Sequence, residues 1–420
     1  KQLRIGTSPA RVTLPSSPVG CSALASIFRA VRVAYPRWIA AALGLGGAGL
    51  VILGAWFTRV FIVPESPHVT AWLVMTLGAV FAMCCARHMP WRLALGIVII
   101  AAAGGAALAF IGGLDPATAA SQHLAFAEEF RAFGTVPYTA ESGAFLKYPS
   151  LSYATTAALP GPLWFTLTNI VAPLFHFLPP PAVFGMRALA LGMIAAAACA
   201  LWGAARAHRI GEHGRVGIIA AFLLLPFTFE YGVIGVSAHL FALLAVVVSY
   251  RAFVAGRYLW SAFALLLGAA FTPLPLLLLP LPLIAVARAK APFRMRVAFL
   301  ALIVAIGVGA ALALAVPFGD AGAVWSRVVR MPDASVHAVL AQALASALPS
   351  FAPETAALIA LALGFVAIVI LGPKRALAAY AVPLSLAALI AVFPLEPEQF
   401  LGTSALLLIA IPVAFRALRR

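Results

Sequence analysis

The sequence has few charged residues and very few acids. Asp, Glu, Lys and Arg make up only 10% of the chain, the acids number 12, and 64% of the residues are hydrophobic. Soluble domains carry about 25% charged residues, so this composition excludes a soluble globular protein. It predicts a polytopic membrane protein, in which the 31 prolines and 33 glycines are expected because membrane helices tolerate both.

Cysteines and metal-ligand spacings are also scarce. The four cysteines fall in apolar or cytosol-facing stretches, which favours packing residues over disulfides or zinc ligands (Cys21, Cys84, Cys85, Cys199). Histidine and acid pairs with HxxxH or DxD spacing are missing, so no metal ligands are assigned. A divalent metal is left open, because imidazole and carboxylate suit manganese or zinc. No internal repeat is visible, which argues against an inverted-repeat transporter.

What the sequence has in abundance is long apolar runs, which predict an all-α fold of about 12 transmembrane helices (11–13). The pair 259–271 and 274–287, split by Thr272-Pro273, is short for two spans. It is either two helices or one re-entrant unit. The predicted helices are 38–57, 70–86, 93–113, 183–204, 216–230, 238–254, 259–271, 274–287, 297–316, 354–372, 376–393 and 400–415.

The topology depends on segment 161–178, whose prolines, Asn169 and His176 favour the outer interface over a span. With that placement most of the 28 Lys and Arg lie inside, and Glu212 is the one acid there. The net charge of +16 is therefore a topology signal, and no nucleic-acid partner is expected. The cations left outside are Arg59, Arg131, Lys147, Arg187, Arg327 and Arg330.

This topology divides the chain into six parts. Residues 1–37, rich in Ser, Pro and Arg, are expected to form a basic cytosolic tail rather than a signal peptide. Both termini are then cytosolic, and two outer loops carry juxtamembrane helices. The remaining parts are three N-terminal helices (38–113), the first outer loop (114–182), central helices (183–316), the second outer loop (317–353) and three C-terminal helices (354–420).

The longest polar interruption begins GGLDPATAASQHLAFAEEF at Gly112 and holds four of the 12 acids. Polar groups flanked by membrane spans are where the chemistry of a membrane protein is usually found. Asp115 follows the third predicted span and precedes Pro116. It is a helix cap, a general base for a bound hydroxyl, or both, because the two roles are compatible.

Further motifs follow in the first loop: Gly134 with Pro137-Tyr138, then Tyr148-Pro149, then PGPLW at 160–164, and Arg187 in FGMRAL. With the early Asp115, this series resembles the GT-C superfamily of integral-membrane glycosyltransferases, in particular polyprenyl-phosphomannose-dependent mannosyltransferases of actinobacterial type. The resemblance covers residues 110–205, and the rest of the chain only as general architecture.

The resemblance implies that Asp115 deprotonates an acceptor hydroxyl, which displaces the sugar from a polyprenyl phosphate with inversion. The partners would be a polyprenyl-phosphate-linked sugar donor, a lipid or glycan acceptor and membrane lipids. The location would be the bacterial cytoplasmic membrane, with the site facing the periplasm. Two features depart from the family: Gln122-His123 replaces a second acid, and a lysine expected near Thr272-Pro273 is missing.

Other outer-side polar residues are candidates for substrate binding. Arg327 and Arg330, three apart, could bind phosphate or lie at lipid headgroups. Arg187 could bind phosphate or anchor a loop acid, and Glu230 could act on substrate or pair with Arg187 or His239. Lys147 is a substrate contact or a solvated loop residue. The full set of candidates is His123, Glu128, Tyr138, Lys147, Tyr148, Arg187, Glu230, His239, Arg327, Arg330 and His337.

Three other functions stay open. An O-antigen-ligase-like enzyme would use Arg327, Arg330 and His337 in the second loop. A lipid or solute transporter would need polar residues at mid-membrane, where the sequence has mainly Ala, Leu, Val, Phe and Gly. An inactive structural homologue would explain the missing lysine and second acid.

Overall fold

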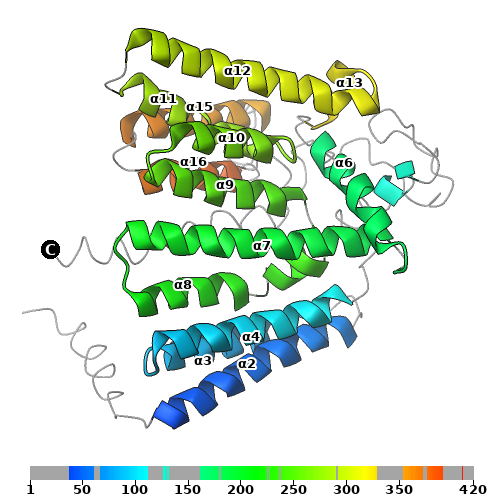
Figure 1. Ribbon diagram of the computed structural model, residues 1–420, viewed down its shortest axis with the longest axis vertical. Coiled ribbons are helices and arrows are strands. Elements are labelled where there is room, and N and C mark those ends of the chain that lie inside the picture. The colour runs from blue at the N-terminus through cyan, green and yellow to red at the C-terminus, as the bar shows by residue number, and fades with distance from the viewer. Residues whose placement is uncertain are drawn as a thin grey trace, which may run out of the picture.

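The computed structural model shows a bundle of roughly antiparallel helices (Figure 1). Every regular element in the described part is helical, and that part contains no strand. Four helices are long and apolar enough to cross a membrane: Ile39–Trp56, Trp91–Phe110, Pro181–Ala207 and Phe293–Phe318. The structure describes residues 37–60, 67–111, 126–128, 130–131, 161–178, 181–224, 226, 228–234, 236, 238–289, 292–328, 353–371, 376–390 and 409.

Most elements follow the predicted apolar runs, α8 is shifted towards the N-terminus relative to the predicted 216–230, and the predicted run 400–415 lies outside the described residues except for residue 409. They are α2 (Arg37–Val60), α3 (Pro67–Ala86), α4 (Trp91–Phe110), α6 (Pro162–Val171), η1 (Ala172–Phe175), α7 (Pro181–Ala207), α8 (Glu212–Leu224), η2 (Thr228–Ile234), α9 (Ala238–Val254), α10 (Tyr258–Ala269), η3 (Leu274–Leu278), α11 (Pro280–Ala287), α12 (Phe293–Ala315), η4 (Val316–Phe318), α13 (Ala321–Val328), α15 (Pro353–Leu371) and α16 (Ala376–Ile390). The helical membrane fold agrees with the sequence prediction, and the number of twelve spans stays a prediction.

The first two helices pack with their backbones in close contact. A Cβ atom on Gly78 of α3 would lie 2.6 Å from the carbonyl oxygen of Gly47 on α2. Any larger residue at this crossing would force the helices apart. Small residues at helix crossings are the usual packing solution in membranes, where van der Waals contact must replace the hydrophobic effect.

Arginines gather at one end of the bundle, which we call the basic end; the opposite end is the far end. At the basic end α3, α7, α9 and α11 finish and α4, α8, α10 and α12 begin (Figure 1). Glu128 and Asp320 belong to the far end, whereas Glu212 starts α8 at the basic end. The arginines of the basic end are Arg87, Arg92, Arg206, Arg209, Arg215, Arg251, Arg257, Arg288, Arg294 and Arg296.

Helix α6, inside the ambiguous segment 161–178, continues directly into η1, and the helical run Pro162–Phe175 covers about 23 Å. This is shorter than the bilayer core of about 30 Å, so the run fits the predicted juxtamembrane position. The N-cap residue of α6 meets the end of α10: the Gly161 amide donates to the Phe271 carbonyl at 2.7 Å. A Cβ at Gly161 would lie 2.1 Å from the Ala270 oxygen, so this contact requires glycine.

Helices α10 and α11 form a hairpin through η3. The first arm, α10, has 12 residues, and the second arm, η3 with α11, is the short apolar helix Leu274–Ala287, so neither arm is long enough to cross a bilayer alone. The chain enters from the basic end, turns at Thr272-Pro273 and returns to the same end before α12. This geometry agrees with the re-entrant alternative for residues 259–287.

Three buried hydroxyls join α9, α10 and α16. Ser249 Oγ lies 2.9 Å from Ser261 Oγ and 2.8 Å from Tyr380 Oη, and Ser261 Oγ lies 3.0 Å from Tyr380 Oη. All three side chains are fully buried. Each hydroxyl can donate once and accept once within this triangle, so the cluster links the three helices by hydrogen bonds.

Candidate functional site

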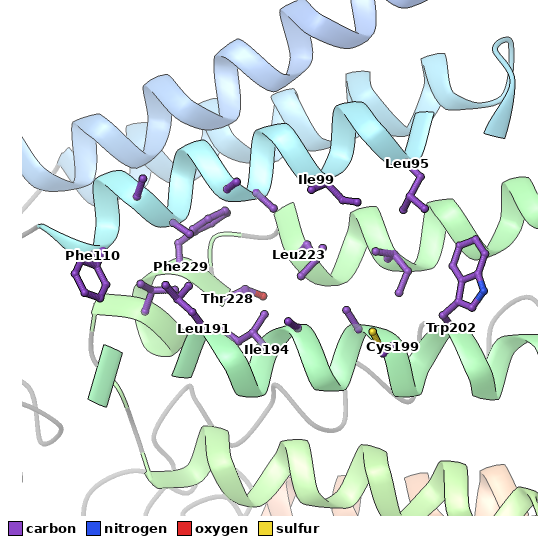
Figure 2. A pocket seen from close by; sticks show the side chains of 18 of the residues that line it. Leu95, Ile99, Phe110, Leu191, Ile194, Cys199, Trp202, Leu223, Thr228 and Phe229 are labelled. Atoms are coloured by element: carbon purple, nitrogen blue, oxygen red, sulfur yellow. The ribbon is translucent and has the colours of Figure 1, made fainter. Parts of the chain in front are cut away.

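A large apolar groove lies between α4 and α7, with α8 and η2 as its floor (Figure 2). We call it the α4–α7 groove. Its volume is about 1180 Å³. Its lining residues are Leu95, Ile99, Ala102, Ala103, Ala106, Ala107, Phe110 and Ile111 on α4 and its C-cap, Leu191, Ile194, Ala195, Ala198, Cys199 and Trp202 on α7, and Ile219, Leu223, Thr228, Phe229 and Val233 below.

Alanine-rich helix faces create the groove. On α4 the four lining residues between positions 102 and 107 are all alanines, and α7 contributes Ala195 and Ala198. These short side chains cannot fill the space between two helices whose backbones are held apart by larger residues at both ends. Phe110 lies at one end of the groove and Trp202 at the other (Figure 2).

The α4–α7 groove is long and opens sideways. Its α4 wall runs from Leu95 to Ile111, which at 1.5 Å per residue is about 24 Å. Ile99 is 52% exposed, and Ala195 and Cys199 on the facing wall are also exposed. A bilayer would therefore have lateral access to a groove almost as long as its own hydrocarbon core is thick.

Polar groups are rare along this surface. Thr228 is the polar side chain on the floor, and its hydroxyl donates to the Phe222 carbonyl at 2.5 Å. The groove therefore offers van der Waals contact and little hydrogen bonding. It suits a hydrocarbon chain rather than a polar solute.

An irregular segment forms the floor at the Phe110 end. After α8 the chain forms the π-helix η2, and Val236 follows with a φ of 51°. A β-branched residue in the left-handed region is strained, and π-helices are frequent at functional sites. The sequence predicts a helix over 216–230, whereas α8 ends at Leu224 and η2 spans Thr228–Ile234, so regular α-helix stops before Glu230. Glu230 lies on η2 between the groove-lining Phe229 and Val233.

Arg187 holds the end of α4 where the α4–α7 groove ends. It is completely buried, and its Nη1 donates to the Phe110 carbonyl at 2.7 Å. Its guanidinium also lies 5.9 Å from the Phe184 ring centroid, which in turn packs on Phe110. Carbonyls in the last turn of a helix have no intrahelical partner and carry partial negative charge. Arg187 is therefore an anchor for the chain that leads to Asp115.

Glu128 is held by two protein partners. One carboxylate oxygen accepts from the Ala182 amide at 2.7 Å, in the first turn of α7. The other accepts from Arg131 Nη2, also at 2.7 Å. A carboxylate at a helix N-terminus satisfies an orphan N–H and the helix dipole together. Glu128 thus fastens the first loop to α7, and its predicted substrate contact stays a prediction.

The other predicted site residues are only partly covered by the structure. For Glu230, His239 and Arg327 the backbone alone is described, on η2, α9 and α13. Of the remaining candidates, the residues outside the described part are Asp115, His123, Tyr138, Lys147, Tyr148, Arg330 and His337. Asp115 follows the described end of the α4–α7 groove, Ile111, by four residues.

Sequence reasoning missed the groove and its basic-end residues. The alanine run IAAAGGAALAF predicts a membrane span but not the helix that it faces, and small residues on two neighbouring spans are the signal that the sequence offers. Within the described part no three His, Cys, Asp or Glu side chains are grouped to hold a metal ion.

Comparisons with protein-family models, curated proteins and solved structures returned no match for this chain.

Replacing Arg187 with leucine is expected to lower the free energy of unfolding by about 2–3 kcal/mol, the usual value of a buried hydrogen bond from a charged donor. Thermal unfolding of the purified protein in detergent would measure the change. Arg131→Gln is the matched control: its side chain is 37% exposed and pairs three residues away, so a loss below about 1 kcal/mol is expected. If both variants lost the same free energy of unfolding, the anchoring role of Arg187 would be contradicted.

Proposed function

We propose that this protein is a membrane glycosyltransferase. It takes a sugar from a polyprenyl-phosphate donor at the outer face of the bacterial cytoplasmic membrane and transfers it to a lipid or glycan acceptor. The observation that supports this best is the α4–α7 groove, which opens sideways and reaches Ile111, four residues before Asp115. A donor with a long apolar chain and a reacting phosphate end needs such a groove leading to a polar site.

The chemistry follows from the residue assigned as base. The Asp115 carboxylate accepts the proton of an acceptor hydroxyl, and the acceptor oxygen forms a bond to the anomeric carbon. The bond from that carbon to the phosphate oxygen breaks, and polyprenyl phosphate leaves with the electron pair. The prenyl chain stays in the Phe110 end of the α4–α7 groove during this displacement, which holds the anomeric carbon near the base.

Reconstitution tests this proposal. Proteoliposomes containing mannosyl polyprenyl phosphate, labelled in the sugar, are incubated with a cell-envelope extract as acceptor. The label should move to a new covalent product while polyprenyl phosphate accumulates. Movement of the intact lipid across the bilayer without a covalent product would instead identify a transporter. Loss of transfer in an Arg327/His337 double variant, with full transfer in an Asp115 variant, would favour the O-antigen-ligase-like alternative.

A further inference from the structure

The α4–α7 groove ends at the basic end in alternating rings and cations. Trp202 lines the groove, and its ring centroid lies 6.0 Å from that of Trp91. The Arg215 guanidinium carbon lies 4.7 Å from the Trp202 centroid, and that of Arg92 lies 5.4 Å from the Trp91 centroid. We call these four residues the arginine–tryptophan cluster. Its rings are continuous with the apolar groove, and its cations lie beyond them.

Arg215 is incompletely satisfied by the protein. Its side chain is 14% exposed, and its Nε has no hydrogen-bond partner among the described residues. Its acidic neighbour, Glu212, is 47% exposed, and the two charged groups are 3.8 Å apart. This distance is too long for a strong hydrogen bond. The guanidinium therefore retains donors for another anion.

The position of Arg215 in α8 also favours binding of an external anion. It lies near the start of the 13-residue helix, where the helix dipole favours an anion and disfavours a cation. His213 Nε2 lies 3.0 Å from the Met89 carbonyl, which ties this helix start to the turn before α4. The arginine–tryptophan cluster thus belongs to two elements fixed against each other, α4 and α8, and to the end of α7.

A ligand that satisfies both features must be amphiphilic. A soluble anion would use the arginines and leave the groove empty, whereas an uncharged lipid would use the groove and leave the arginines unpaired. Tryptophans are enriched where bilayers meet water, and basic residues attract anionic lipids there. A phospholipid with an anionic headgroup meets all these conditions.

We propose that the basic end binds one anionic phospholipid from the bilayer leaflet on that side. Its phosphate group contacts Arg215 and Arg92, and one acyl chain enters the α4–α7 groove between Leu95 and Cys199. This site lies at the opposite end of the groove from Ile111. It does not rest on the proposed glycosyl transfer, and a protein without that activity would still bind the lipid.

Lipid binding to the full-length purified protein tests this proposal. Native mass spectrometry in detergent would compare dioleoyl phosphatidylglycerol with dioleoyl phosphatidylcholine, and soluble glycerol phosphate would serve as the headgroup alone. Phosphatidylglycerol should bind best. Arg92→Gln/Arg215→Gln should weaken phosphatidylglycerol binding roughly 25-fold, about fivefold for each basic residue. The matched control is Arg257→Gln/Arg288→Gln, which removes two exposed arginines of the basic end, one just before α10 and one just after α11. It should bind like the wild type.

Several results would contradict the proposed phospholipid site at the basic end. Equal binding of both phospholipids by the wild type would overturn the proposal, as would equal weakening in the control, which would show general attraction to a basic surface. Equal binding of glycerol phosphate would show an anion site without a lipid chain. If the double glutamine variant does not fold, Arg92→Lys/Arg215→Lys keeps the charges and should keep the preference for phosphatidylglycerol; its loss would contradict the proposal.

Discussion

Replacing Asp115 with asparagine is expected to reduce sugar transfer roughly 100- to 10,000-fold, the usual contribution of a general base. Asparagine keeps the capacity of aspartate to cap a helix, since the two are similarly good N-caps. It lacks the carboxylate that accepts a proton. The substitution therefore separates the two roles that the sequence leaves together at this position. Initial rates with a labelled polyprenyl-phosphate sugar measure the effect.

Two comparisons make the Asp115 experiment specific. Asp115→Ala should be as inactive as the asparagine variant, because both lack the base. Asp320→Asn is the matched control at the far end, where Asp320 Oδ2 accepts from the Ala323 amide at 2.8 Å at the start of α13. It should keep wild-type activity and expression. Full activity of Asp115→Asn with loss in Asp115→Ala would show that Asp115 is a cap and not the base.

Filling the α4–α7 groove should cause the second large loss of sugar-transfer activity. Ala195→Trp places an indole in an exposed part of the groove wall, where it excludes part of the donor chain. If four methylene groups lose their contacts at about 0.8 kcal/mol each, kcat/KM for a long-chain donor falls roughly 200-fold. Steady-state kinetics with long-chain and short-chain donors measure this effect.

The control for groove filling is the neighbouring residue. Ala196 is also exposed on α7 but does not line the groove, so Ala196→Trp should retain activity with both donors. For Ala195→Trp the short-chain donor should react normally, because its chain does not reach the indole. A comparable loss with both donor lengths would indicate damage to the helix packing, and the groove would then not be the chain-binding surface.

The helices could be predicted from the sequence because apolar runs and their breaks are local features. The run 238–254 coincides with α9, and α7 extends the predicted 183–204 by only a few residues. The short α6 also fits the charge-based placement of 161–178 at the outer interface rather than across the membrane. Such features need only length, hydropathy and charge.

The site was harder to predict because it depends on contacts between distant segments. Arg187 is a predicted phosphate ligand or partner of a loop acid, and both roles stay predictions; the structure adds an acceptor that the sequence does not indicate, the Phe110 carbonyl, 77 residues away. Backbone carbonyls have no signature in the sequence. The α4–α7 groove is defined by side chains that are too small to fill a space, so it becomes visible only when α4 and α7 face each other.

The attachment of the first loop has a consequence for the entropy of binding. Glu128 joins the loop to α7, Arg187 joins α7 to the end of α4, and Gly161 joins α6 to α10. Fixing the backbone of one residue costs about 1–2 kcal/mol at 25 °C. At these three points the backbone is already ordered when the protein folds, so substrate binding does not lose this conformational entropy again. More of the interaction energy with a donor is then available for holding the reacting groups in place.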